Sequence, residues 1–505
     1  MRSIQNGVSY DFLIVGSGFG GSVLAACLKQ AGKKVLMIER GTHPRFAVGE
    51  SSTPIADMIL RELADTYSLP YLNRISRYGE WQRSYPDVIC GLKRGFSYYK
   101  HEKGKIFRGD EDHTRECLVA ASMDDENSDT NWLRSDVDHF LVEKAVESGV
   151  DYLEQAEIRK LTRNEAESAW IANISLKDQE LTVTCNWIVD ATGSPAFSRR
   201  YFGTEVQSDF FKTDSEALFT HFDGAQRWDS RLQEKGCIIT DYPYRPDDSA
   251  LHQLIDEGWI WMLRFRTGLL SAGLVLDRNR NLYDGSLPES FWRQVISSYP
   301  SLQELFEEAS VSDQPGTFLT TGRLQRRLNR VWGEGWVAMN HTAGFVDPLH
   351  STGIAFTLSG IEKLLKIFTG DLDREKTDAG FRQYEHSLFR ELEFIDTLVA
   401  CCYAAGTHFR LFTASVMLYF AATVLYEQSR LRGEKPDYFL NADHSGLTGI
   451  TLETYCDLKA IGSNPSDDQI EKLTEKIRER IRPFNSAGLM DPEKKNIYRH
   501  TAVVL

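Results

Sequence analysis

The sequence predicts an α/β protein in which one domain is assembled from separated pieces of the chain, with an antiparallel sheet inserted between them and a mostly helical C-terminal region. Three patterns indicate this fold class. Residues 10–38 have the pattern of a strand, a helix and a second strand. Residues 205–325 alternate apolar residues with turns, as antiparallel strands do. From about residue 375 onward the periodicity is mostly helical.

The first unit is expected to consist of a strand over Tyr10–Val15, a helix over Ser22–Ala31 that Gly32 stops, and a strand over Lys34–Ile38. A strand–helix–strand order of this kind is typical of doubly wound, Rossmann-like sheets.

Further elements follow from local signals. A helix is expected to begin at Ser135, with Ser135 and Asp138 as a capping-box-like pair and Gly149 at its end. Residues 260–275 are expected to form a hairpin around Thr267-Gly268.

The expected domain organisation has six parts. The Rossmann-like domain takes residues 1–64, 116–204 and 326–374, a segment on the substrate side takes residues 65–115, the inserted antiparallel sheet takes residues 205–325, and the helical region takes residues 375–505.

Composition narrows the classes of function. The chain has 505 residues, 42% hydrophobic and 26% charged, and its formal charge of −14 disfavours nucleic-acid binding. Its eight cysteines are scattered without a C-x-x-C pair, so no metal site is expected and a reducing cytoplasm is favoured. Export is not expected, because the first residues lack the charged-then-apolar pattern of a leader. Leu411–Tyr426, at 16 uncharged residues, is shorter than the roughly 20 that span a bilayer, so a buried helix is expected, with a membrane-surface or substrate-lining helix as the alternative.

The strongest motif is Gly16-Ser17-Gly18-Phe19-Gly20-Gly21, which satisfies G-x-G-x-x-G between a strand and a helix. The first glycine permits a tight turn, the second lets a pyrophosphate approach the backbone, and the last lets the helix pack on the sheet. The helix N-terminus offers free N–H groups to the phosphates. Glu39, at the end of the second strand with Arg40 beside it, is expected to bind the adenosine ribose. The alternative is a glycine-rich turn that binds nothing.

Later motifs distinguish FAD from NAD. Asp190-Ala-Thr-Gly193, Arg134 before a helix, and Gly344–Pro348 followed by Ser351-Thr-Gly353 resemble the FAD motifs of flavoproteins of the para-hydroxybenzoate hydroxylase type. No second G-x-G-x-x-G occurs, so a separate flavin reductase is the expected partner. The residues expected to bind FAD are Gly16, Gly18, Phe19, Gly20, Gly21, Glu39, Arg40, Gly49, Glu50, Ser51, Arg134, Asp190, Gly193, Asp347, Gly353 and Ile354.

Three stretches resemble one branch of that superfamily, the flavin-dependent halogenases. Residues 45–54 (RFAVGESSTP) resemble the family's G-E-[SA]-x-x-P strap along the flavin, and residues 89–98 resemble its K-x-G-x-x-[FW] segment, which carries a catalytic lysine, here Lys93. Residues 252–265 resemble its G-W-x-W-x-I-P signature, except that Leu263-Arg264 replaces Ile-Pro. His350 stands where tryptophan halogenases have glutamate, which disfavours free tryptophan as the substrate.

The resemblance implies a mechanism. Reduced FAD and O2 oxidise chloride or bromide, bound near Thr352 and Gly353, to hypohalous acid. Lys93 hydrogen-bonds and aims this acid, or forms a haloamine with it, toward an electron-rich aromatic ring of the phenol, pyrrole or indole type, free or tethered to a carrier protein. His350 accepts the ring proton. Trp259 and Trp261 wall the flavin from the substrate.

The sequence also allows interpretations in which these residues have no catalytic role. Lys93 lies near Arg94 and Lys100, and such a run is usually a solvated loop. The charged residues 100–116 and the acidic run 124–129 are expected to be exposed loops. Trp259 and Trp261 could belong to a core strand, and His350 could bond the backbone.

Two other functions stay open, the first of them because Arg264 replaces proline. One is a related monooxygenase or prenyl-reductase-like enzyme, which halide dependence would separate from a halogenase. The other is a non-catalytic FAD-binding protein.

Overall fold

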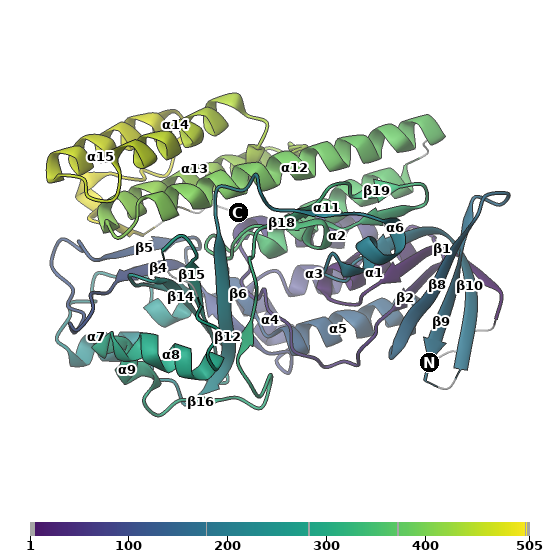
Figure 1. Ribbon diagram of the computed structural model, residues 1–505, viewed down its shortest axis with the longest axis horizontal. Coiled ribbons are helices and arrows are strands. Elements are labelled where there is room, and N and C mark those ends of the chain that lie inside the picture. Colours follow the sequence, from purple (N-terminus) through teal and green to yellow (C-terminus); the bar gives the residue numbers. More distant parts are fainter. Residues whose placement is uncertain (1–5, 178, 281–282, 371–372, 500, 502–505) are drawn as a thin grey trace.

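A computed structural model of the chain describes residues 6–177, 179–280, 283–370, 373–499 and 501. Its helices and strands build two large sheets with helices around both, and the long helices of the C-terminal region lie across one side of the molecule (Figure 1).

The first sheet has the predicted Rossmann-like core. β1 pairs in parallel with β2 on one side and with β10 on the other, and β10 continues in parallel to β20. Its strands are β1 (Val8–Val15), β2 (Val35–Ile38), β7 (Asp151–Leu153), β8 (Ala156–Asn164), β9 (Ala169–Leu176), β10 (Gln179–Asp190), β19 (Trp332–Gly333) and β20 (Trp336–Ala338). The predicted strand–helix–strand unit at the start of the chain is thereby confirmed.

Three helices pack on this sheet and correct two expected boundaries. They are α1 (Phe19–Gln30), α5 (Arg134–Glu147) and α11 (Gly353–Thr369). Helix α1 begins at Phe19 rather than Ser22, because the extended residue Gly18 precedes it directly. Helix α5 begins at Arg134, and the expected capping pair is absent because Asp138 binds the Arg134 guanidinium instead, with an Nη2–Oδ2 distance of 2.8 Å.

The second sheet is mostly antiparallel. Its strands are β4 (Gly95–Lys100), β5 (Glu116–Ala120), β12 (Ser215–Asp223), β13 (Ala250–Leu254), β14 (Gly258–Arg264), β15 (Leu270–Asp277), β16 (Ser310–Val311), β17 (Leu319–Thr320) and β22 (Ile497–Tyr498). The predicted hairpin is β14–β15. β5 lies in this sheet beside β4, although the sequence analysis assigned residue 116 onward to the Rossmann-like domain.

Side chains alternate between the two faces of this sheet, as the period of two requires. On β14, Trp259, Trp261 and Leu263 contact the main core, whereas Ile260 and Met262 belong to a second core. The helices that cover this second core are α7 (Trp228–Glu234), α8 (Pro288–Ser297) and α9 (Pro300–Phe306). The face with the tryptophans is therefore the one that faces the rest of the molecule.

A short ribbon, β3 (Cys90–Lys93) with β6 (Asp129–Trp132), lies between the two sheets. Three short helices precede it in the chain: α2 (Pro54–Tyr67), α3 (Pro70–Arg74) and α4 (Tyr78–Ser84). Short strands β11 (Val206–Gln207), β18 (Arg326–Leu328) and β21 (Gly344–Phe345) form a further ribbon, and α6 (Ala196–Phe202) and α10 (Asn340–Ala343) complete this part.

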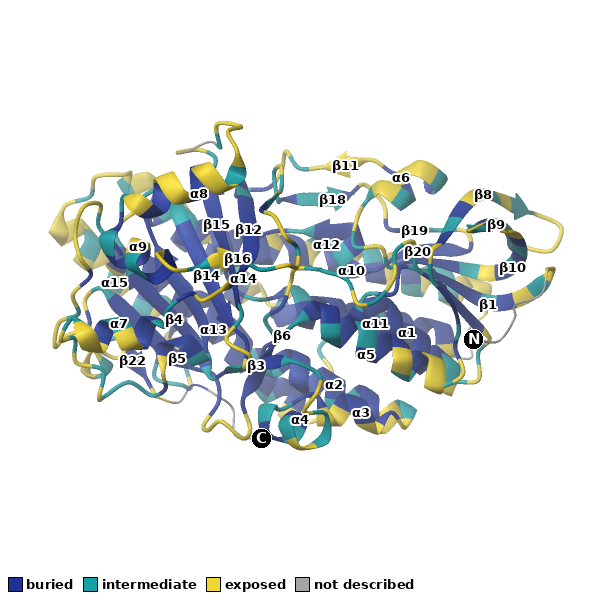
Figure 2. Cartoon of the chain, turned by 90° about the horizontal axis from the view of Figure 1, so that it is seen from below, coloured by how far each residue is buried: buried dark blue, intermediate teal, exposed yellow. Residues whose placement is uncertain are grey.

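The C-terminal region consists mainly of α12 (Arg374–Ala404), α13 (Phe409–Leu431), α14 (Ser445–Ile461) and α15 (Asp467–Ile481). Helix α13 contains the apolar stretch expected to be a buried helix. It is long and apolar enough to cross a membrane, but 89% of its most apolar window is buried inside the protein (Figure 2). This burial confirms the prediction of a core helix. Strand β22, which was not predicted, pairs in parallel with β5 of the second sheet.

Candidate active site

The glycine motif forms a turn that only glycines can make. A Cβ on Gly21 would lie 2.1 Å from the carbonyl oxygen of Gly16, and a Cβ on Gly16 would lie 2.6 Å from that of Ala191. Gly16 also has a φ of +104°, in the region that favours glycine. The turn therefore brings the chain close to the Asp190–Gly193 motif at the ends of two neighbouring parallel strands.

A cavity of about 520 Å³, here called the large cavity, opens beside this turn. The N-termini of α1 and α11 both border it, so free N–H groups and positive helix ends face the space. Of the residues expected to bind FAD, those lining it are Gly18, Phe19, Gly20, Gly21, Gly49, Glu50, Ser51, Arg134, Gly193, Asp347, Gly353 and Ile354. The structure thus brings segments from all four FAD motifs and the strap together.

Two further observations indicate that the large cavity fits a flavin dinucleotide. The Ser51 hydroxyl is buried at its edge and has no hydrogen-bond partner in the part of the chain that the structure describes. A Cβ on Gly353 would meet no atom within 4 Å, so the backbone there faces free space. A bound molecule with polar groups would satisfy the first and fill the second.

Four of the expected FAD residues do not line the large cavity. Gly16 forms the turn beneath it, and Arg40 is exposed. Asp190 is buried and accepts hydrogen bonds from Thr192 and Ser198, which shape its own turn. The remaining one, Glu39, lies just behind the turn.

The Glu39 carboxylate accepts hydrogen bonds from the N–H groups of Ser17 and Gly41 and pairs with Arg45. Burial raises its pKa, but Arg45 and these N–H groups outweigh burial, so that the pKa is lowered overall. The Glu39 carboxylate therefore stays ionised, as an acceptor for ribose hydroxyls must be.

The strap is fixed from both sides. Arg134 donates to the carbonyl oxygens of Val48 and Gly49 at 2.9 and 3.0 Å. Glu50 is buried and accepts from the Ser271 hydroxyl at 2.6 Å, and the Trp261 indole N–H donates to that hydroxyl at 3.2 Å. The strap is thus connected to the tryptophan strand across the large cavity.

The two tryptophans of β14 differ in surroundings. Trp261 lines the large cavity, and Gly273 on β15 leaves room for its ring, since a Cβ there would lie 2.1 Å from the indole. Trp259 lies farther along the strand and donates to the Tyr403 hydroxyl at 3.1 Å. Of the two residues expected to bind halide, Gly353, the first residue of α11, lines the large cavity, whereas Thr352, the N-cap of that helix, does not.

Lys93 is buried, with no exposed side-chain surface, at the end of β3. Its Nζ donates to the carbonyl oxygen of Ser52, lies 4.0 Å from Asp129 Oδ2 and lies 4.2 Å from the centre of the Phe96 ring. Burial lowers the pKa of Lys93 to about 8, although the nearby carboxylates oppose this. The interpretation of Lys93 as part of a solvated loop is therefore wrong.

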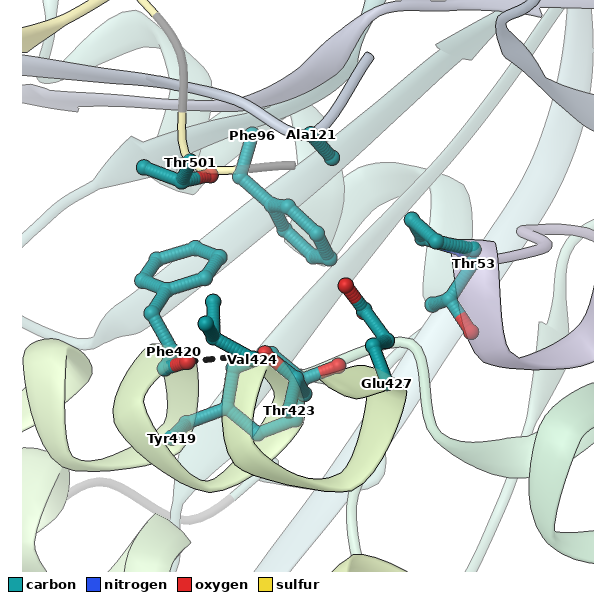
Figure 3. A pocket seen from close by; sticks show the side chains of 10 residues that line it. Thr53, Phe96, Ala121, Tyr419, Phe420, Thr423, Val424, Glu427 and Thr501 are labelled. Carbon is teal, nitrogen blue, oxygen red and sulfur yellow. Dashed lines mark hydrogen bonds between the residues drawn. The ribbon is translucent and has the colours of Figure 1, made fainter. Parts of the chain in front are cut away.

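A small pocket of about 20 Å³ lies beside Phe96, between β4 and α13, and is here called the β4–α13 pocket. Figure 3 shows Phe96 across it from Tyr419, Phe420 and Glu427 of α13. Thr53, next to the carbonyl that binds Lys93, is at its edge. The space holds about one water molecule, so an aromatic ring enters only if the walls move apart.

His350 is buried among aromatic rings rather than in the wall of the large cavity. Its ring stacks on Tyr419 with centroids 4.4 Å apart, and its Nδ1 has no hydrogen-bond partner among the described residues. Burial and nearby His252 lower the pKa of His350 to about 3. The ring is therefore neutral and a weak proton acceptor.

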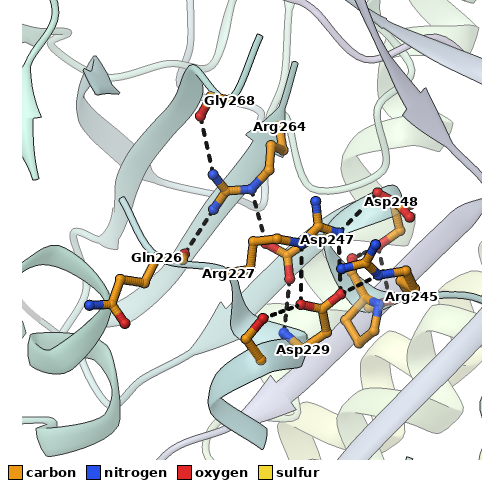
Figure 4. A network of polar contacts seen from close by, with 12 residues as sticks. Gln226, Arg227, Asp229, Arg245, Asp247, Asp248, Arg264 and Gly268 are labelled. Carbon is orange, nitrogen blue, oxygen red and sulfur yellow. Dashed lines mark hydrogen bonds and ion pairs between the residues drawn. The ribbon is translucent and has the colours of Figure 1, made fainter. Parts of the chain in front are cut away.

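Arg264, which departs from the family signature, is part of a buried ion-pair network (Figure 4). Its guanidinium binds Asp247 at 3.1 Å and the carbonyl oxygens of Ala225, Gln226 and Gly268. Leu263, the preceding residue, lines the large cavity, whereas Arg264 does not. This network explains why arginine can replace the family's proline at this position, and the replacement leaves the cofactor side of β14 unchanged.

Sequence reasoning missed three groups of the site. Asp129, in the run expected to be an exposed loop, is 2% exposed because it begins β6 opposite Lys93. Three polar residues precede Trp132 in this strand, so its sequence gave no apolar signal of burial. His341 and His252 line the large cavity and had no assigned role. Glu116, in the other run expected to be exposed, is also buried.

Comparison with known proteins decides the family. Residues 133–409 match the family model described as tryptophan halogenase, and residues 14–81 match that of an NAD(P)-binding Rossmann-like domain. The chain belongs to the tryptophan halogenase family. It is 28% identical to the monodechloroaminopyrrolnitrin halogenase of Pseudomonas fluorescens over 93% of this chain and 85% of that protein. The tetracycline 7-halogenase of Kitasatospora aureofaciens is 24% identical over 97% of this chain and 90% of that protein.

Solved structures agree on the fold. The crystal structure of the halogenase PltM superposes with a TM-score of 0.83 at 21% identity, covering 96% of this chain and 99% of that one. The protein is therefore an enzyme of the flavin-dependent halogenase type with FAD as its cofactor. The competing predictions of a monooxygenase or a non-catalytic binder are thereby disfavoured.

Proposed function

We propose that this enzyme halogenates a neutral, electron-rich aromatic compound of the phenol, pyrrole or indole type, and that Lys93 delivers the halogen. The observation that carries the proposal is the position of Lys93: fully buried, beside a carboxylate, and in contact with an aromatic ring that lines the β4–α13 pocket. A buried ammonium is costly unless it is needed, so a chemical role accounts for it better than a structural one.

Bound FAD, once reduced, would supply with O2 the oxidising power that turns chloride or bromide into hypohalous acid. The cofactor would be held by the glycine turn, the strap and the N-terminus of α11, and the halide by the backbone N–H groups near Thr352 and Gly353. Trp261 lines the large cavity and would separate the cofactor from the substrate.

The Lys93 ammonium would then hydrogen-bond the oxygen of the hypohalous acid. The carbon–halogen bond forms as the halogen–oxygen bond breaks, the leaving hydroxide takes the ammonium proton and departs as water, and the ring proton returns the amine to ammonium. With a pKa near 8, Lys93 can both give and regain a proton at neutral pH. His350 is the weaker candidate for accepting the ring proton, since its pKa is about 3.

Two relatives act on a pyrrole held by a carrier protein, among them the 1H-pyrrole-2-carbonyl-[peptidyl-carrier protein] chlorinase of Pseudomonas fluorescens. The β4–α13 pocket is too small to hold an aromatic ring as it stands, so the proposal leaves open whether the substrate is free or held by a carrier protein. A separate flavin reductase would supply reduced FAD, because no second nucleotide-binding glycine motif occurs in the sequence.

The test supplies purified protein with FAD, a flavin reductase, NADH and bromide, and follows a panel of phenols, indoles and pyrroles by mass spectrometry. Lys93→Ala is expected to abolish brominated product while FAD binding persists. The matched control is Lys103→Ala, whose side chain is half exposed, and His350→Gln is expected to keep most activity. Oxygenated product without halide, or product unaffected by Lys93→Ala, would refute the proposal.

A further inference from the structure

Two carboxyl groups share the closed interior with Lys93. Asp129 faces Lys93 directly across the β3–β6 ribbon, and both side chains are almost completely buried. Asp57, on α2, accepts a hydrogen bond from the Ser52 hydroxyl at 3.0 Å and is hydrogen-bonded to the Asp129 carboxyl. The backbone of the same Ser52 accepts the hydrogen bond from Lys93. The three ionisable side chains therefore form one connected cluster.

Two carboxyl groups joined by a hydrogen bond must share a proton, because two carboxylates this close repel each other. Burial and the neighbouring Asp129 raise the pKa of Asp57 well above its usual range. Burial also raises the pKa of Asp129, but Lys93 and the hydrogen bond from Asp57 oppose that effect. The proton therefore belongs to Asp57 and the negative charge to Asp129, the carboxyl nearer to Lys93.

Other charged or titratable groups border this cluster from each packed element. On α2, Arg61 interacts with both carboxyls. On β13, His252 is close enough to Lys93 to interact with it, and burial keeps its pKa at about 4, so it is neutral. On α13, Tyr419 and Glu427 line the adjoining β4–α13 pocket. Asp129 remains the carboxylate for which the structure gives an ion-pair distance to Lys93.

We propose that Asp129 is the positioning residue for Lys93: its carboxylate, with Asp57 as a protonated partner behind it, orients the Lys93 amine and favours its return to ammonium after each halogen transfer. The role of Asp129 rests on Lys93 being the group that delivers the halogen. No other proton acceptor is needed, because the proton released by the aromatic ring replaces the Lys93 proton that leaves with water.

A pair of near-isosteric variants separates the two carboxyls. Asp129→Asn removes the negative charge beside Lys93, so the Lys93 ammonium loses its proton at lower pH. Asp57→Asn keeps a hydrogen-bond donor toward Asp129 and changes no charge if Asp57 is the protonated member. The first variant is expected to move the alkaline limb of the bromination rate down by about one pH unit or more, and the second to leave it in place.

The measurement is a single-turnover bromination series from pH 6.5 to 9.5 with chemically reduced FAD, O2, bromide and the best substrate of the panel. Bromide oxidation is followed separately with a trapping reagent for escaping hypobromous acid, and FAD affinity by flavin fluorescence. Both are expected to stay as in the unaltered enzyme, because neither carboxyl lines the large cavity. Asp129→Glu, which keeps the charge, is expected to restore the limb at least in part.

Three results would overturn the role of Asp129: an unshifted limb in Asp129→Asn, a limb shifted equally by Asp57→Asn, or a shift in bromide oxidation itself. If Asp129→Asn does not fold, Asp57→Asn still tests the proposal. A downward shift of the alkaline limb in that variant would place the negative charge on Asp57 rather than on Asp129. Lys93→Met in the same series separates the two proposals. If Lys93→Met stays active, the proposed function fails; if it is inactive while the limb does not move, only the role of Asp129 fails.

Discussion

The large cavity and the β4–α13 pocket are two interior spaces built in opposite ways. The first measures about 520 Å³ and is formed by backbone turns, glycines and helix N-termini. The second measures about 20 Å³ and is closed by aromatic side chains from β4 and α13. A backbone-built space exists before its ligand arrives, whereas a space filled by side chains can open for a ligand and close again. The comparison indicates a preformed site for the cofactor and, beside Phe96, a small space that a ring can enter only if its walls move apart.

The largest expected effect concerns the backbone-built space. Gly21→Ala should weaken FAD binding by more than about 100-fold and lower thermal stability, because the new Cβ would collide with the Gly16 carbonyl oxygen. Gly353→Ala is the matched control: its Cβ meets no protein atom, so stability should persist while FAD binding weakens only through loss of space. FAD titration by fluorescence and thermal unfolding measure both. Normal FAD binding by Gly21→Ala would show that the turn can relax.

The next effect concerns the departure from the family signature. Arg264→Met should reduce the free energy of unfolding by about 3 kcal/mol, because it leaves the Asp247 carboxyl buried without its cation. Arg245→Met removes an exposed partner of the same network and should cost less than about 1 kcal/mol. Urea unfolding gives both values. Equal losses in the two variants would mean that burial of the Arg264 pair is not what stabilises this region.

The third effect tests whether the interior around Lys93 is as dry as its contacts indicate. The pKa of Lys93 is lowered from its ordinary 10.5 to about 8. Between these values the unfolded chain binds more protons than the folded one, so the free energy of unfolding rises with pH. The lysine therefore destabilises the fold fully below pH 8, by about 3 kcal/mol, and no longer does so above pH 10.5.

Lys93→Met removes this pH dependence. The unaltered protein should be the less stable of the two at pH 7 and should approach the variant as the pH rises from 8 to 10. Urea unfolding at each pH measures the difference. A constant difference across this range would mean that Lys93 is hydrated in the folded state, and the contrast between the two spaces would lose its basis.

Much of the fold could be predicted because it depends on local signals. The glycine motif needs a strand before it and a helix after it, and the sequence shows both within residues 10–31. The hairpin of residues 260–275 and the buried helix at residues 411–426 were likewise visible from periodicity and turn residues. The predicted helix starts differ from the observed ones by one to three residues. Capping depends on whether a polar side chain binds the backbone or another side chain, and Asp138 binds Arg134 instead of the backbone.

The sequence by itself determined the cofactor class and the family and singled out Lys93 as the candidate lysine, since each signal lies in a short contiguous motif. Only the tertiary structure decided the chemistry around that lysine. Asp129 and Lys93 are 36 positions apart and come together only because β3 pairs with β6. The neutral state of His350 and the pKa of Lys93 both follow from burial, which depends on how α13 and the sheet pack. A charged run looks the same in sequence whether water or a closed interior surrounds it, so only packing distinguishes a solvated loop from a buried charged cluster.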